Sequence, residues 1–189
     1  MAKKTKASNN WLQTTAVRVS RIHFIYILAF LLSIVVFDTW NLYTHEAVSQ
    51  LWTAGGILLI FNVLIWFVSR LKLSNYWYYI GFMLALIVAD IIFASYIVWW
   101  QRGLYSKAIM LYTVPIITAA TMRSRSILLA VTTLSVAAYS ITSVRFFFKN
   151  YGLGYRVELW GTVGFYSAIL FVLALLLMVV IRPTEEKFN

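Results

Sequence analysis

Six apolar runs dominate this sequence and decide what the chain can fold into. Each run is close to the roughly 20 residues that an α-helix needs to cross a hydrocarbon core of about 30 Å. Because short polar turns separate the runs, the sequence predicts an all-α, polytopic membrane protein, a bundle of six transmembrane helices with short loops. The runs, of which the fourth is the shortest, cover about 22–41, 50–70, 76–100, 106–122, 126–146 and 158–181.

The composition also requires lipid as the solvent. Of 189 residues, 62% are hydrophobic and 12% are charged, whereas soluble domains are about 45–50% apolar and about 25% charged. A soluble globule of this size would lack the polar surface to cover itself. The chain has no cysteine, which excludes disulfides, thiolate metal sites and cysteine nucleophiles. Its net charge of +10 lies between the apolar runs rather than along one face, so we expect no nucleic-acid partner.

The basic residues also predict the orientation in the membrane. Eleven Lys and Arg residues lie at the amino end, in the second and fourth turns and in the tail, and five lie in the other three turns. The positive-inside rule then places both termini in the cytoplasm, in a cell (plasma or inner) membrane. We therefore expect a polar, basic cytoplasmic segment over 1–21, a six-helix transmembrane domain over 22–182 and a short cytoplasmic tail over 183–189.

Missing residue types exclude several kinds of membrane chemistry. No lysine lies in mid-span, where a retinal Schiff base would need one, and the two histidines, His23 and His45, lie at opposite faces, which argues against haem. His45 and Glu46 form a lone pair that we expect in an outer loop. Motifs of zinc proteases, serine hydrolases and P-loops are absent from the sequence. We expect no cofactor and no metal.

Two pairs of glycines lie inside the apolar runs. They are Gly55 with Gly56, and Gly161 with Gly164. Small residues at such positions usually permit two helices to approach closely, so we expect a packing role for both pairs.

One carboxylate, Asp90, lies well inside a run, in the stretch LIVADIIFASY. An ionised acid there costs a few kcal/mol, so we expect its side chain to face protein or water rather than lipid. Asp90 lies roughly 15 Å below the Trp99–Trp100 pair, and Asn62 in the second run lies at about the same depth, where the two could share a hydrogen bond. Two interpretations stay open. Asp90 is either an interhelical clamp or part of a small polar pocket that binds a ligand or senses protons.

The fourth and fifth runs carry further residues of interest. In the fifth run Thr132, Ser135, Tyr139 and Thr142 recur at helical spacing on one face. In the fourth run Pro115 lacks a backbone donor and frees a carbonyl, which is tolerated only in a buried place. The candidate residues of a polar pocket are therefore Asp90, Asn62, Tyr112, Pro115, Ser135 and Tyr139.

The third and fourth runs carry a recognisable order of residues. Asp90 is followed by a short outer turn, QRGLYSKA, with Arg102 and Gly103, and then by a stretch with Tyr112, Pro115-Ile116 and Ala119-Ala120 before the basic turn of Arg123 and Arg125. This order resembles the six-helix membrane input module of RegB- and PilS-type sensor histidine kinases. The resemblance implies a bundle with both ends in the cytoplasm and an outer turn that takes part in sensing. Quinone-responsive members have a double glycine and Asn-Pro-Phe in that turn, which here has one glycine.

Such kinases continue into a helix that bears the phosphorylated histidine and then into an ATP-binding domain. Here no histidine follows His45. We therefore expect no catalytic activity of the chain as given, and kinase activity only if the chain is a fragment of a sensor kinase.

These features favour a sensory or regulatory membrane module that passes a signal to a partner through helix rearrangement. The expected partners are the lipid bilayer and either a second copy or a partner membrane protein or kinase. Two alternatives stay open: a structural or accessory subunit of a membrane complex, and a small transporter or channel, which would need a continuous polar path. An enzyme is the least expected class, because one carboxylate alone is not a catalytic constellation.

Overall fold

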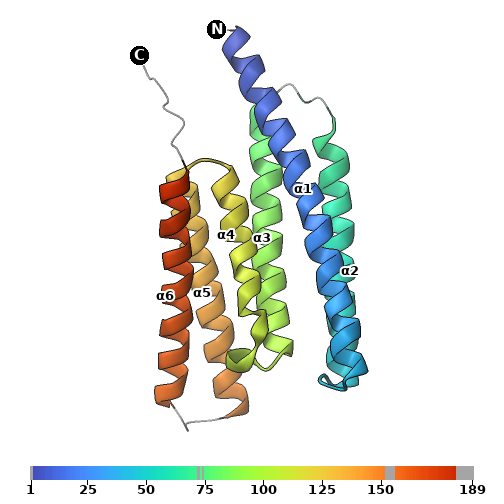
Figure 1. Cartoon of the computed structure of the whole chain (residues 1–189), viewed down its shortest axis with the longest axis vertical. Helices are drawn as coiled ribbons and strands as arrows, with labels where there is room; N and C mark the ends of the chain where they lie inside the picture. The colour runs from blue at the N-terminus through green and yellow to red at the C-terminus, as the bar shows by residue number, and fades with distance from the viewer. Residues whose placement is uncertain (1, 72, 74, 152–155, 182–189) are drawn as a thin grey trace. The chain divides into compact units, whose positions relative to one another are not determined.

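The computed structural model describes residues 2–71, 73, 75–151 and 156–181, with side chains described from Trp11 onward except at Arg156. All regular structure in these ranges is helical (Figure 1). The predicted all-α class is thus confirmed. Five α-helices are long and apolar enough to cross a membrane. They are α1 (Ala2–Thr39), α2 (His45–Ser69), α3 (Tyr76–Trp100), α5 (Arg125–Asn150) and α6 (Arg156–Val180); the short elements η1 (Gly103–Tyr105), η2 (Lys107–Tyr112) and α4 (Thr113–Thr121) lie between α3 and α5.

The long helices leave most of their apolar surface uncovered. In α6 the most apolar stretch has a mean hydropathy of 2.7 and only 17% of it is buried, and even in α3 the share is 44%. Apolar surface of this extent is unfavourable in water, because each helix would expose far more than the patch that a soluble monomer tolerates. The chain is therefore a multi-pass membrane protein.

The chain divides into two compact units, Met1–Ala89 and Asp90–Asn189, which are described separately below. In the first unit α1 and α2 run side by side in opposite directions (Figure 1). Asn62 on α2 donates a hydrogen bond from Nδ2 to the carbonyl of Ser20 on α1 at 3.0 Å. After α2, the hydroxyl of Tyr79 donates to the carbonyl of Leu71 at 2.8 Å and accepts from the amide of Leu73. These bonds satisfy backbone groups where the chain turns into α3.

The glycines have different surroundings. A Cβ added at Gly55 would lie 2.6 Å from Cδ2 of Leu31, so the close approach predicted there is confirmed. Added at Gly56, Gly161 or Gly164, it would meet nothing within 4 Å. The prediction of close packing was therefore wrong for Gly161 and Gly164, because α6 turns this face away from its neighbours. Both glycines are exposed.

Several helices extend beyond their apolar runs. Thr44 accepts a hydrogen bond from the amide of Ala47 and caps α2, so His45 and Glu46 lie in its first turn rather than in a loop. Helix α5 continues past the run predicted to end at about 146 and includes Lys149 and Asn150. Likewise α1 begins at Ala2 and includes most of the segment predicted as a separate amino-terminal region. Hydropathy marks the part of a helix that lies in hydrocarbon, whereas the backbone bonds continue the helix until a cap or turn ends it.

The fourth apolar run is not one α-helix. It begins as the 3-10 helix η2 and becomes α-helical at Thr113, two residues before Pro115. Pro115 lies in the first turn of α4. Backbone N–H groups in that turn have no acceptor within the helix, so the N–H that proline lacks costs no helical hydrogen bond. If the α-helix began earlier in the sequence, the ring of Pro115 would clash with the carbonyl of Leu111. Since a 3-10 helix rises about 2 Å per residue, η2 and α4 together still extend roughly 25 Å.

The segment from η1 to α4 also runs along α5. Gly103 in η1 packs against the ring of Phe146, near the carboxyl end of α5. At its other end, α4 is joined to the start of α5 by a tight turn with Arg123 at φ 54° and with Ser124 capping α5. From Gly103 to Ser124 the chain therefore runs along most of the length of α5, and it then returns in the opposite direction as α5 itself.

Candidate functional site: a buried polar and aromatic cluster

The centre of the second unit holds a hydrogen bond between two helical elements. The hydroxyl oxygens of Ser95 on α3 and Tyr112 on η2 are 2.8 Å apart. Ser95 also donates to the carbonyl of Ile91 at 2.8 Å. Because a serine hydroxyl has one hydrogen and a carbonyl can only accept, Tyr112 is the donor to Ser95. The Tyr112 side chain is fully buried. Its hydroxyl is therefore held in one direction in apolar surroundings.

Two more tyrosines continue this pair. The ring of Tyr112 contacts the ring of Tyr139 on α5 edge to face, with centroids 5.9 Å apart, and Tyr139 contacts Tyr166 on α6 in the same way at 6.1 Å. Edge-to-face pairs at these distances are attractive. The hydroxyl-bearing residues Ser95, Tyr112, Tyr139 and Tyr166 therefore link α3, η2, α5 and α6. We call them the tyrosine cluster.

The other candidate residues of the second unit are also buried. Asp90 is 1% exposed, Ser135 is completely buried, and Pro115 is buried in α4. Thr132, on the same face of α5, donates to the carbonyl of Leu128 at 2.8 Å and so satisfies its hydroxyl within its own helix. An uncharged or hydrogen-bonded Asp90 agrees with this degree of burial, since an isolated carboxylate would be strongly disfavoured there.

Asn62 belongs to the first unit. Its Nδ2 bonds Ser20, as described above, which joins α1 to α2. Its pairing with Asp90 stays a prediction, and we do not count it among the cluster residues.

The outer turn has a well-defined backbone. Arg102 and Gly103 both have left-handed conformations, with φ of 73° and 61°. Glycine favours this region, whereas arginine adopts it at some cost. Ser106 then caps η2 by accepting from the amide of Ala108 at 3.0 Å and donates to Oε1 of Gln101 at 3.2 Å. These interactions fix the path of the chain from α3 into η2.

The outer turn is also joined to α6. Tyr105 donates from its hydroxyl to Oε1 of Glu158, in the first turn of α6, at 3.0 Å. Its ring lies near that of Tyr151, at 6.3 Å, and Tyr151 in turn contacts Phe146. On the other side of Phe146 lies Trp99, edge to face at 5.5 Å. The turn that Arg102 and Gly103 begin is thus packed against the ends of α3, α5 and α6.

The chemistry that this arrangement can perform is limited. Phenol and serine hydroxyls can exchange hydrogen-bond partners or bind a small polar or aromatic ligand. Within the ranges that the structure describes, no three His, Asp or Glu side chains come together as metal ligands. The tyrosine cluster contains no base that would activate a nucleophile.

Sequence reasoning identified Tyr112 and Tyr139 but missed Ser95, Tyr105, Glu158 and Tyr166. Ser95 and Tyr166 are isolated polar residues in apolar helices, so no periodic pattern marks them. One signal was available for Ser95, because it lies in the same stretch as Asp90, about one and a half turns further along the helix.

Comparisons with known proteins found no match to this chain among family models, curated proteins or solved structures.

Proposed function

We propose that this protein is a sensory or regulatory membrane module that crosses the bilayer six times, with both ends in the cytoplasm, and signals by rearranging its helices. The observation that carries the proposal is the tyrosine cluster, which joins four helical elements inside the second unit through one hydrogen bond and two ring contacts. The proposed partner is a cytoplasmic or membrane protein that reads the position of α6.

The contacts suggest how a stimulus at the outer turn would reach α6. Tyr105 bonds Glu158 at the first turn of α6, and the chain then leads through η2 to Tyr112 in the centre. A change at the turn would act on α6 at two points, its first turn and Tyr166. A two-state element of this kind needs only a few kcal/mol between its arrangements. The loss of one hydrogen bond is therefore enough to change their ratio measurably.

The fourth crossing is supported by the antiparallel course of η1, η2 and α4 along α5. The roughly 25 Å of η2 and α4 is slightly less than the hydrocarbon thickness, and local thinning or the flanking basic residues can make up the difference. An even number of crossings also agrees with the basic residues at both ends of the sequence.

The test is a distance measurement between the ends of α5 and α6. Because the chain has no cysteine, Arg125→Cys and Val180→Cys can carry spin labels without removing native thiols. Both side chains are exposed. In nanodiscs we expect two populated distances, whose ratio changes about fivefold in Tyr112→Phe, which corresponds to about 1 kcal/mol. Tyr78→Phe removes the same atom from an exposed side chain and is the matched control.

A single distance that is the same in the wild type and in Tyr112→Phe would contradict a sensory role. The tyrosine cluster would then be a structural clamp. In that case the accessory-subunit alternative is favoured, since only 17% of the most apolar stretch of α6 is buried and many of its side chains are open to lipid or a partner. A stoichiometric partner that co-purifies in mild detergent and is lost when exposed Leu176 is replaced by Trp would support that alternative.

A further inference from the structure

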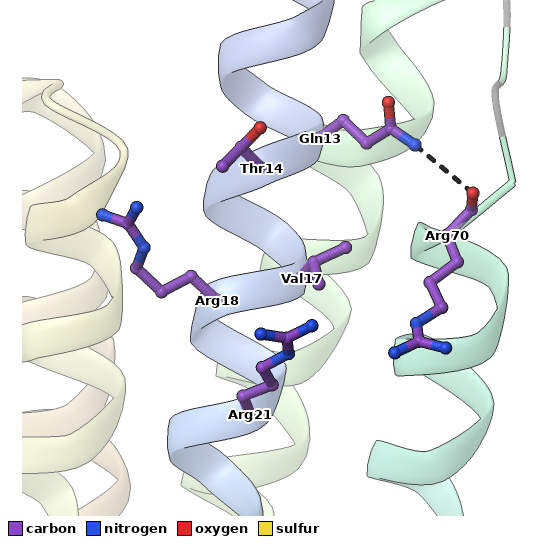
Figure 2. A pocket seen from close by; sticks show the side chains of 6 residues that line it. All are labelled: Gln13, Thr14, Val17, Arg18, Arg21 and Arg70. Carbon is purple, nitrogen blue, oxygen red and sulfur yellow. Dashed lines mark hydrogen bonds between the residues drawn. The ribbon is translucent and has the colours of Figure 1, made fainter.

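A basic pocket lies in the first unit, apart from the tyrosine cluster. It has a volume of about 350 Å³ and is formed by one stretch of α1 and the end of α2. In Figure 2, Arg21 on α1 and Arg70 after α2 extend toward the space between the two helices. The lining residues are Gln13, Thr14, Val17, Arg18, Arg21 and Arg70.

Two interactions hold the walls of this pocket. Gln13 directs its Nε2 at the carbonyls of Ser69, Arg70 and Leu71, each at 3.4 Å. These carbonyls lie at the end of α2, where no further turn supplies amide donors. The guanidinium of Arg70 lies 3.8 Å above the ring of Trp66, a cation–π contact that leaves its N–H edges available. The pocket is therefore shaped before any ligand enters.

The charges in the pocket are all positive. Within the described residues, Arg18, Arg21 and Arg70 form no ion pair. The acids of the first unit are Asp38 and Glu46. Asp38 is 17 positions from Arg21 on the same helix, or roughly 25 Å away. With three arginines and no acid among its lining residues, the pocket favours an anion over water.

The donor set favours phosphate among anions. Arginine presents paired N–H groups that match two oxygens of a phosphate. The α1 residues of the pocket lie in the first part of the apolar span Trp11–Thr39, and the ends of a span of this length are expected to reach the lipid headgroups. Basic pockets between helices at the cytoplasmic surface are suited to anionic lipid headgroups. We propose that Arg21 and Arg70 bind the phosphate group of an anionic phospholipid, in a pocket whose wall Gln13 holds in place.

The test counts bound lipids by native mass spectrometry of the whole chain released from mixed micelles. We expect one phosphatidylglycerol to be retained, and no phosphatidylcholine. Arg21→Gln is expected to weaken retention at least tenfold, because it removes a charge-assisted pair of hydrogen bonds. Arg125→Gln removes one exposed charge from the first residue of α5 and should leave retention unchanged.

Further measurements distinguish a lipid from a soluble phosphate compound as the ligand, and a loss of binding from a loss of folding. Arg70→Lys keeps the charge but loses the paired geometry, so an intermediate affinity is expected. If inorganic phosphate alone raises the melting temperature in lipid-free detergent, and Arg21→Gln abolishes that effect, a soluble phosphate compound occupies the site and the lipid assignment is overturned. Equal retention of phosphatidylglycerol by the wild type, Arg21→Gln and Arg70→Lys, with unchanged circular dichroism, would overturn the site itself.

Discussion

The hydroxyl of Tyr112 on η2 donates to the hydroxyl of Ser95 on α3, and the two oxygens are 2.8 Å apart. This bond lies between a 3-10 helix and an α-helix, and the same tyrosine ring contacts Tyr139 on α5. Tyr112, in the short fourth apolar run, is thus hydrogen-bonded to α3 and packed against α5.

The Ser95–Tyr112 bond should appear as a coupling energy. Ser95→Ala and Tyr112→Phe should each lower the free energy of unfolding by about 1 kcal/mol, and the double variant should lose about 0.5–1 kcal/mol less than the sum. The measurement is a reversible unfolding titration in mixed detergent micelles. If the loss in the double variant equals the sum of the losses in the two single variants, the Ser95–Tyr112 bond contributes no coupling energy.

Gly103 should not tolerate a side chain. Its φ is 61°, and an added Cβ would come within 2.7 Å of Cγ of Phe146. Gly103→Ala should therefore cost about 1–3 kcal/mol of stability, combining strain with overlap. Gly164→Ala, which meets no neighbour, should be neutral or slightly stabilising.

A second variant separates the two causes at this glycine. In a Phe146→Ala background the overlap disappears, and Gly103→Ala should then cost only about 1 kcal/mol from the left-handed backbone. An unchanged cost in that background would mean that the Phe146 contact is irrelevant.

The α1–α2 contact should depend on Gly55 and not on Gly56. Gly55→Leu would push against Leu31 and Phe30, so we expect a loss of about 1–3 kcal/mol, whereas Gly56→Leu faces open space and should cost far less. Thermal unfolding of the two variants, followed by Trp fluorescence, provides the comparison. Equal melting temperatures would contradict the close approach.

Asp90→Asn should insert and fold, because asparagine has nearly the same volume and needs no charge in a site that is 1% exposed. If Asp90 belongs to the switching element, the ratio of spin-label distances between Arg125→Cys and Val180→Cys should change. Asp38→Asn, at the exposed end of α1, should leave that ratio as it is. An unchanged ratio in both variants would assign Asp90 to packing alone.

The long helices were predictable because apolar length is a strong signal. The run 76–100 has the same first and last residues as α3, because turn residues precede Tyr76 and follow Trp100. The ends of α2 and α5 were less predictable. Caps such as Thr44 and the continued backbone bonding past Arg145 are local effects that hydropathy does not register.

The site was predictable only in part. Tyr139 was identified because it recurs with other polar residues on one helical face, and Tyr112 because it lies on one face with Pro115. The switch from 3-10 to α geometry before Pro115 could not be read from a pattern of apolar residues, because both forms present the same composition. The basic pocket was also missed. Arg18, Arg21 and Arg70 were counted as orientation signals, and their convergence depends on the antiparallel register of α1 and α2.

The central claim is that lipid surrounds this chain and that residues 107–121 form the fourth of six crossings. Labelling of single cysteines in intact cells with a membrane-impermeant maleimide tests it most directly. Lys107→Cys and Arg125→Cys are both at exposed positions that flank the short segment. We predict that Lys107→Cys reacts from outside and that Arg125→Cys reacts only after the membrane is permeabilised. Reaction of both cysteines from the same side would contradict the account.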